Sequence, residues 1–237
     1  MKLGSVIFDL DGTLLDTLGD LTCAVNHALT TYGMSPFELV RVRRYVGNGV
    51  PKLIERALYF ATTGEEPDME SGEFDDRALF NACLATFTEY YDAHNADLTA
   101  PYDGVSEMLD NVKELGLKSA IVTNKYDGAA QALQKRFFGA VDAVVGAMPG
   151  IRPKPAPDGV YRALELIGAD ARQAIYVGDG ETDIATAKNC GMPVVAVSWG
   201  FRDRDMLATL GPDYIIDAPH ELIGVLDEIT RTDGGAK

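Results

Sequence analysis

Three short apolar runs, each followed directly by polar residues, constrain the fold of this chain most. The runs are residues 5–8 (SVIF), 119–122 (SAIV) and 174–177 (AIYV). They are rich in β-branched residues and continuous rather than alternating, which is typical of strands that are buried on both faces. Helical patterns lie between and after these runs, at residues 104–114, 127–135, 158–167 and 182–190. A fourth strand-like run lies at residues 194–197. This alternation predicts βαβ units in a parallel α/β sheet.

Residues 17–95 interrupt this alternation. They offer helical stretches at residues 18–32, 36–46, 51–60 and 77–91, and no convincing strand. A length of 237 residues allows one domain with a smaller insert. We therefore expect an α/β core formed by residues 1–16 and 96–237, and a helical domain formed by residues 17–95.

Charge and composition exclude several classes of protein. A formal net charge of −15 at pH 7 argues against binding to nucleic acid or to anionic lipid. No stretch approaches the ~18 apolar residues of a membrane helix, and residues 1–4 (MKLG) do not resemble a signal peptide. We expect a cytoplasmic protein without membrane contact. The three cysteines form no C-x-x-C pair, which indicates neither a disulfide framework nor a zinc site. The oligomeric state, monomer or dimer, is left open.

Paired carboxylates follow two of the strand-like runs. Asp9 and Asp11 come after the first run, and Gly12 next to them allows a tight turn and close approach of the backbone to an anion. Two carboxylates this close repel each other unless a divalent cation binds or one holds a proton. Asp179 and Asp183 follow the third run, and the carboxyl ends of parallel strands meet in one crevice. Oxygen ligands of this number suit Mg²⁺.

A hydroxyl and a lysine complete a set of groups that can transfer a phosphoryl group. Thr123 follows the second run, and Lys154 lies between prolines that stiffen its loop. Taken alone, each Asp is more typical of a helix N-cap or a turn than of a catalytic site, and a lone lysine is usually a solvated charge. Together, the metal and the lysine could neutralise phosphoryl charge. Asp9 could then attack phosphorus to give an aspartyl-phosphate, with Asp11 as acid and base.

Residues 9–16 (DLDGTLLD) resemble the first motif, D-x-D-G-T-[LV]-x-D, of the haloacid dehalogenase-like hydrolase superfamily. Thr123 is similar to its second motif, Lys154 to its third, and the G-D-x-x-x-D segment at 178–183 to its fourth, in the same order. The resemblance implies an α/β fold with a Rossmann-like parallel sheet core. It also implies a small α-helical cap domain inserted after the first motif.

The resemblance further implies roles for the acidic residues. Asp9 would be the nucleophile and a Mg²⁺ ligand, and Asp11 the general acid/base whose backbone carbonyl binds the metal. Asp179 would be a direct ligand, and Asp183 mainly a support for the other ligands.

Other roles are implied for the groups around the phosphoryl oxygens. Thr123, Asn124 and Lys154 would bind these oxygens, beside the turn at Gly12. Lys154 would also hold the carboxylates of Asp9 and Asp179.

Residues 46–58 (VGNGVPKLIERAL) resemble the cap loop of the phosphoglycolate phosphatases. Gly49 helps to leave backbone N–H groups accessible, and Lys52 and Arg56 lie four residues apart on one helix face, where they could bind a small carboxylate. They could equally be solvated helix charges. Residues 41–58 hold five basic residues against one acid, whereas residues 65–76 hold seven acids and no base. We assign no function to that acidic stretch.

These features predict a Mg²⁺-dependent phosphomonoester hydrolase that acts on a small anionic phosphorylated metabolite, with 2-phosphoglycolate as the best single candidate. On the same core, a pyrophosphatase, a sugar-phosphate phosphatase or a β-phosphoglucomutase-like phosphomutase stays open. An alternative of another class is a phospho-signalling receiver-like domain, in which the metal-binding acids precede the acceptor Asp. Here the acceptor candidate, Asp9, comes first, which disfavours that class.

Overall fold

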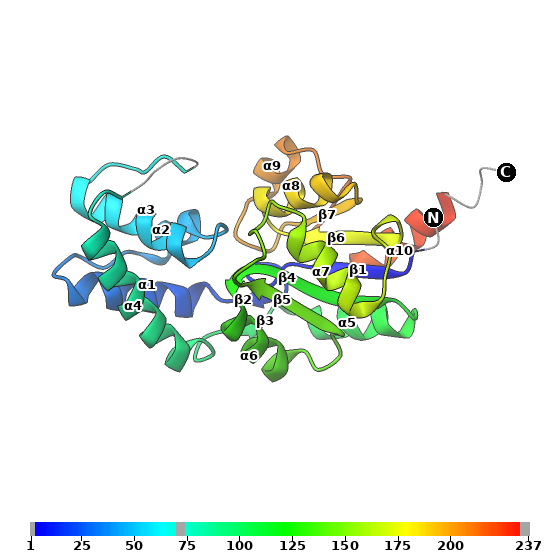
Figure 1. Ribbon diagram of the computed structural model, residues 1–237. Coiled ribbons are helices and arrows are strands. Elements are labelled where there is room, and N and C mark those ends of the chain that lie inside the picture. The colour runs from blue at the N-terminus through cyan, green and yellow to red at the C-terminus, as the bar shows by residue number, and fades with distance from the viewer. Residues whose placement is uncertain (1–2, 70–73, 233–237) are drawn as a thin grey trace. The chain divides into compact units, whose positions relative to one another are not determined.

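The computed structural model describes residues 3–69 and 74–232, and the chain forms two compact units (Figure 1). An α/β unit comprises Met1–Asp16 and Pro101–Lys237, and a helical unit comprises Thr17–Ala100. The helical unit is therefore a single insertion, placed directly after the first acidic segment.

The α/β unit contains a six-stranded sheet in the order β5-β4-β1-β6-β7-β8, in which every pairing is parallel. The strands are β1 (Ser5–Phe8), β4 (Lys118–Tyr126), β5 (Ala143–Ala147), β6 (Ala174–Gly178), β7 (Val194–Val197) and β8 (Tyr214–Ile216). The strand order reverses between β1 and β6, because the chain continues from them toward opposite edges of the sheet. Open parallel sheets bind ligands beyond the strand ends at such a switch point.

Helices cover the sheet of the α/β unit. They are α5 (Val105–Glu114), α6 (Asp127–Phe137), α7 (Asp158–Ile167), α8 (Glu181–Cys190), α9 (Arg204–Thr209) and α10 (Glu221–Thr232), with a short 3₁₀ helix η1 at Ala171–Gln173. Helix α7 packs on β4 and β5, α8 on β6 and β7, and α5 on β4 and α10. Every residue of β1, β6 and β7 is buried, which explains why these strands read as continuous apolar runs.

The prediction of a parallel α/β sheet with helical elements is confirmed. It located β1, β6, β7 and the first part of β4, but it missed β5 and β8. These two strands lie at the edges of the sheet, and β8 has only three residues, so neither leaves a long apolar run. Strand β4 also continues through Tyr126, four residues beyond the apolar run that predicted it.

The helical unit consists of α1 (Leu18–Thr31), α2 (Leu39–Tyr45), α3 (Val50–Thr63) and α4 (Arg77–His94). Helix α1 packs on the other three, and the buried side chains of Val25, Leu53 and Phe87 belong to the core of this unit. The short strands β2 (Leu15–Asp16) and β3 (Ala100–Pro101) pair with each other. Across the described residues, no helix is both long and apolar enough to span a bilayer.

A buried carboxylate holds the two ends of the helical unit together. Asp20, in the first turn of α1, accepts hydrogen bonds from the backbone N–H of Leu98 at 3.0 Å and of Thr99 at 2.9 Å. The hydroxyl of Thr99 donates a third, at 2.7 Å. The segment that leaves the unit is thereby fixed beside the helix that enters it.

Candidate active site

Three carboxylates meet at the switch point of the sheet. Asp9 directly follows β1, and its backbone N–H donates to the carbonyl of Val177 in β6 at 2.9 Å. Asp179 directly follows β6, and Asp183 lies in the first turn of α8. One oxygen from each of these three side chains lies within 4.8 Å of the others, and all three residues are buried. The structure thus brings together three of the four predicted metal ligands.

Burial makes this cluster unfavourable while all its members are charged. Burial and repulsion from Asp183 raise the pKa of Asp9 to about 7, against the attraction of Lys154. Burial also raises the pKa of Asp179 well above its usual value, with repulsion from Asp183 and Asp9 in addition. A bound cation would favour the charged forms and remove much of this cost.

The donor set fits Mg²⁺. The cluster offers only carboxylate oxygens, the hard ligands that this ion prefers. Among the described residues, the buried Oδ1 of Asp9 has no partner other than Nζ of Lys154, which lies at 2.7 Å. An oxygen in this state retains a lone pair for a further cation.

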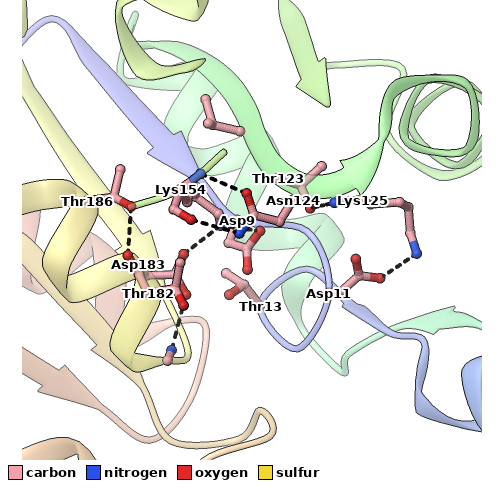
Figure 2. A network of polar contacts seen from close by, with 12 residues as sticks. Asp9, Asp11, Thr13, Thr123, Asn124, Lys125, Lys154, Thr182, Asp183 and Thr186 are labelled. Carbon is pink, nitrogen blue, oxygen red and sulfur yellow. Dashed lines mark hydrogen bonds and ion pairs between the residues drawn. The ribbon is translucent and has the colours of Figure 1, made fainter. Parts of the chain in front are cut away.

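Lys154 lies at the centre of the buried charges (Figure 2). Its Nζ lies 2.7 Å from Oδ1 of Asp9 and 2.7 Å from Oδ1 of Asp183, and it donates to the hydroxyl of Tyr176 at 3.2 Å. Burial disfavours the charged form, but attraction to Asp183 and Asp9 outweighs burial and raises the pKa of Lys154 well above its usual value. Lys154 therefore stays protonated at neutral pH.

One expected partner of Lys154 is replaced by another. The resemblance implied that Lys154 holds Asp9 and Asp179, whereas the structure pairs it with Asp9 and Asp183. The carboxylate of Asp179 instead accepts a hydrogen bond from the backbone N–H of Phe201 at 2.7 Å. Sequence spacing places both acids near the lysine, and the direction of each side chain decides the pairing.

The side chain of Asn124 holds the loop that carries Lys154. Its Oδ1 accepts from the backbone N–H of Lys154 at 2.8 Å, and its Nδ2 donates to the carbonyl of the same residue at 3.1 Å. Sequence reasoning expected Asn124 at the phosphoryl oxygens. In the structure these bonds fix the position of the lysine.

Strand β4 also supplies a residue that sequence reasoning missed. The hydroxyl of Thr123 is buried and accepts from the backbone N–H of Lys125 at 3.1 Å. Nζ of Lys125 forms an ion pair with Oδ1 of Asp11 at 3.0 Å (Figure 2). The carboxylate of Asp11 thus has a lysine partner of its own. The sequence feature that could have indicated this role is a lysine that directly follows the polar residues at the end of a buried strand.

The loop after β7 supports the acidic cluster. In addition to the bond from Phe201, the indole N–H of Trp199 donates to the carbonyl of Thr13 at 3.0 Å. Arg202 forms a two-pronged pair with Glu181, at 2.8 Å for both contacts. The loop is thereby joined to the first motif and to the start of α8.

Two glycines leave room for the carboxylate of Asp179. A Cβ at Gly12, where φ is +86°, would lie 2.3 Å from Oδ2 of Asp179. A Cβ at Gly200 would lie 2.4 Å from the Cβ of Asp179 and 2.3 Å from the carbonyl oxygen of Gly12. All three distances are shorter than real Cβ contacts, so side chains at these positions would displace the carboxylate or the loop.

Arg56 is buried inside the helical unit. Its Nη1 donates to the carbonyl of Tyr45 at 2.7 Å, and its Nη2 donates to Oδ1 of Asn48 at 2.8 Å. The residue is only 3% exposed, which corrects the alternative that it is a solvated helix charge. These bonds use the guanidinium to fix the loop that precedes α3.

The other expected binding residues of the helical unit lie at the start of α3. Gly49 occupies the N-cap position with a φ of +83°, a conformation that favours glycine. Lys52 is partly exposed and pairs with Glu55 at 2.9 Å. Both remain candidates for substrate contact.

The acidic and basic stretches of the helical unit pair with each other. Glu66 accepts from Arg41 at 2.5 Å, from the hydroxyl of Tyr45 at 3.0 Å and from Arg44 at 3.4 Å. Residues 70–73 of the acidic stretch lie outside the described residues. Glu66 thus neutralises basic charge within its own unit.

The chain is similar to known proteins over most of its length. The sequence model of the haloacid dehalogenase-like hydrolase family matches residues 6–197. The chain is 36% identical over 233 residues to the phosphoglycolate phosphatase of Caulobacter vibrioides, covering 94% of this chain and 92% of that protein. It is 33% identical over 230 residues to the N-acetylmuramic acid 6-phosphate phosphatase of Pseudomonas aeruginosa, covering 96% of both. A crystal structure of a candidate phosphoglycolate phosphatase from Lactobacillus delbrueckii subsp. bulgaricus has a TM-score of 0.86 at 34% identity, covering 95% of this chain and 99% of that one.

Proposed function

The chain belongs to the haloacid dehalogenase-like hydrolases and is a phosphatase, and we propose that it hydrolyses 2-phosphoglycolate to glycolate and phosphate with Mg²⁺ and an aspartyl-phosphate intermediate. The observation that carries this proposal is the position of Asp9. Its carboxylate lies at the switch point of the sheet, between the ammonium of Lys154 and two further buried carboxylates. A nucleophile, a cation and a metal-ligand set therefore meet where the fold binds ligands.

In the first step, a carboxylate oxygen of Asp9 attacks phosphorus, and the bond from phosphorus to the leaving alkoxide breaks. Lys154 and the hydroxyl of Thr123 bind the phosphoryl oxygens and offset their charge. Asp9, Asp179 and the backbone carbonyl of Asp11 would hold Mg²⁺, which supplies charge neutralisation for the transferred phosphoryl group. Asp183 keeps Lys154 in place through their ion pair. Its carboxylate also accepts a hydrogen bond from the backbone N–H of Gly180 at 3.1 Å.

Asp11 handles the protons of both steps. As an acid it donates a proton to the leaving alkoxide, which departs as an alcohol. As a base it then takes a proton from the water that attacks the aspartyl-phosphate, and phosphate leaves Asp9. One carboxylate thus returns to its starting state after each turnover.

The helical unit is proposed to act as the cap that contributes substrate specificity. It is inserted between β2 and β3, directly after the segment that contains the proposed nucleophile. Gly49 and Lys52 would meet the carboxylate of the substrate, and Arg56 would support them by fixing the loop before α3. The phosphoglycolate phosphatases among the relatives support this substrate.

N-acetylmuramic acid 6-phosphate is a second candidate substrate. The relative named for that reaction is matched over 96% of both chains, against 94% and 92% for the phosphoglycolate phosphatase of Caulobacter vibrioides. Its phosphate would meet the same core residues, while the sugar would need more room at the cap. The two candidates therefore differ in their demands on the helical unit and agree in the chemistry of the core.

The experiment that tests the proposal is phosphate release across a panel of substrates with Mg²⁺. The panel contains 2-phosphoglycolate, N-acetylmuramic acid 6-phosphate, hexose phosphates, nucleoside monophosphates and pyrophosphate. We expect kcat/KM for 2-phosphoglycolate to exceed those for the hexose phosphates, nucleoside monophosphates and pyrophosphate by about 100-fold or more, because a site built for a carboxylate rejects substrates without one. N-acetylmuramic acid 6-phosphate also carries a carboxylate, on its lactyl group, so it is separated from 2-phosphoglycolate by the room that its sugar needs. A preference for another member of the panel would refute 2-phosphoglycolate as the substrate. Phosphate release that a chelator does not reduce would refute the requirement for Mg²⁺.

A variant at the nucleophile completes the test. Asp9→Asn should release no phosphate on any substrate while retaining the fold. Turnover within a few-fold of the wild type would remove Asp9 as the nucleophile.

A further inference from the structure

Lys125 is a buried charge that the proposed chemistry does not use. We propose that Lys125 is a positioning residue whose ammonium holds the carboxylate of Asp11 where it can transfer protons. This inference rests on the proposed function, in which Asp11 is the general acid/base. It adds to that function a residue outside the four motifs.

The contact between the two residues is direct and shielded from solvent. Nζ of Lys125 lies 3.0 Å from Oδ1 of Asp11, and their side chains are 2% and 13% exposed. A buried ammonium is strongly unfavourable unless a partner compensates it. Asp11 provides this compensation, so neither side chain is expected to leave the other without cost.

The two buried lysines contact three of the four carboxylates of the site. Lys154 contacts Asp9 and Asp183, whereas Lys125 contacts Asp11 (Figure 2). The carboxylates of Asp9 and Asp11 repel each other, and a cation on the side of Asp11 offsets this repulsion. The structure thus separates the nucleophile and the acid/base electrostatically, with one ammonium for each.

The backbone of β4 fixes the place of Lys125. The strand continues through Tyr126, and its pairing with β5 shifts register between Val122 and Tyr126. Such irregularities re-aim side chains at the end of a strand. The backbone N–H of Lys125 also donates to the hydroxyl of Thr123. The residue that would bind the phosphoryl oxygens and the residue that holds Asp11 are therefore set by the same strand end.

Fixing Asp11 matters because proton transfer requires hydrogen-bond reach to the moving proton. A catalytic group that is misplaced by about 1 Å can lose about 100-fold in rate. We expect Lys125→Met to lower kcat by about 10- to 100-fold with KM nearly unchanged. Such a split would follow from a change in proton transfer and not in substrate binding.

The leaving group separates this role from a general effect on the fold. Nitrophenolate needs little protonation to depart, so the nitrophenolate burst from 4-nitrophenyl phosphate should be far less affected by Lys125→Met than turnover of 2-phosphoglycolate. Lys125→Arg retains the charge and should recover part of the lost kcat. Lys113→Met removes an exposed lysine of α5 in the same unit and should behave as the wild type.

A double-variant comparison decides the inference. If Lys125 acts through Asp11, Lys125→Met should change the single-turnover rate of glycolate release from 2-phosphoglycolate in Asp11→Asn by less than about 2-fold, because the group that it positions is already gone. An equal loss in both backgrounds would overturn the inference. If Lys125→Met does not fold, as judged by circular dichroism, the same comparison is made with Lys125→Arg. Its effect must likewise disappear in Asp11→Asn.

Failure of the inference is distinguishable from failure of the proposed function. If the wild type forms no phosphoenzyme, or Asp9→Asn still turns over, the proposed function is wrong and the inference falls with it. If both behave as proposed but Lys125→Met retains the wild-type kcat on 2-phosphoglycolate, only the positioning role is wrong.

Discussion

Replacing Asp9 with Asn should abolish turnover and yet stabilise the Mg²⁺-free protein at pH 8. Burial and repulsion from Asp183 raise the pKa of Asp9 to about 7, against 3.8 for an unperturbed Asp. Between these two values the folded protein holds a proton that the unfolded chain has released. The free energy of unfolding therefore falls as pH rises from about 4 to 7. Below about pH 4 the carboxyl is protonated in both states, and this cost is absent.

The size of the effect follows from the shift. A difference of about 3 pKa units, at about 1.4 kcal/mol per unit, gives a cost of about 4 kcal/mol at pH 8. Asn has no charge to bury, so Asp9→Asn avoids this cost. At pH 5 the wild type has incurred less than half of this cost. The increase in the free energy of unfolding caused by Asp9→Asn should therefore be about 3 kcal/mol larger at pH 8 than at pH 5.

The assay is urea unfolding with a chelator at pH 5 and pH 8, followed by the fluorescence of Trp199. This is the only tryptophan in the chain, and it lies in the α/β unit. Asp110→Asn, at an exposed position in α5, is the control and should change stability little at either pH. Added Mg²⁺ should stabilise the wild type more than Asp9→Asn. If Asp9→Asn is no more stable than the wild type at pH 8, or gains equally at both pH values, the reasoning is refuted.

Two further substitutions test contacts around the cluster. Tyr176→Phe removes a buried hydroxyl that contacts the central ammonium and should destabilise the protein by about 2 kcal/mol. Tyr161→Phe, at an exposed position, should change little, and equal urea midpoints for the two variants would contradict the prediction. Gly200→Ala places a Cβ 2.4 Å from the Cβ of Asp179 and should weaken Mg²⁺ binding about 10-fold or more, as measured by calorimetry. Gly139→Ala meets no atom within 4 Å and is its control, so similar Mg²⁺ affinities would exclude the steric argument.

Much of the fold could be predicted because burial on both faces leaves a strong pattern. Strands β1, β6 and β7 are buried along their full length, and each is a continuous apolar run. Strand β5 at one edge has partly buried ends, and β8 at the other edge is short, so both give weak signals. The polar end of β4 was missed for a different reason. Its polar side chains form hydrogen bonds and ion pairs with residues from other parts of the site, and local composition does not reveal these partners.

The meeting of the acidic residues was also predictable, because parallel strands place their carboxyl ends at one edge. The pairings within the cluster were not. Asp179 and Asp183 are four residues apart and both lie close to Lys154, yet only Asp183 is turned toward it. The choice depends on the backbone N–H of Phe201, which holds Asp179 from the loop after β7.

The helical unit shows why net charge along a segment is a poor guide to anion binding. The basic stretch suggested a surface for an acidic substrate, but Arg41 pairs with Glu66 of the acidic stretch. Arg56 is buried, and a substrate would have to compete with three existing hydrogen bonds, to the carbonyls of Tyr45 and Met69 and to the side chain of Asn48. Under the proposed function, recognition of the carboxylate in this unit therefore depends on Lys52 and on the backbone around Gly49. Charge reversal at Lys52 should then raise KM for 2-phosphoglycolate without a comparable fall in kcat, whereas a substrate that lacks a carboxylate should be affected little.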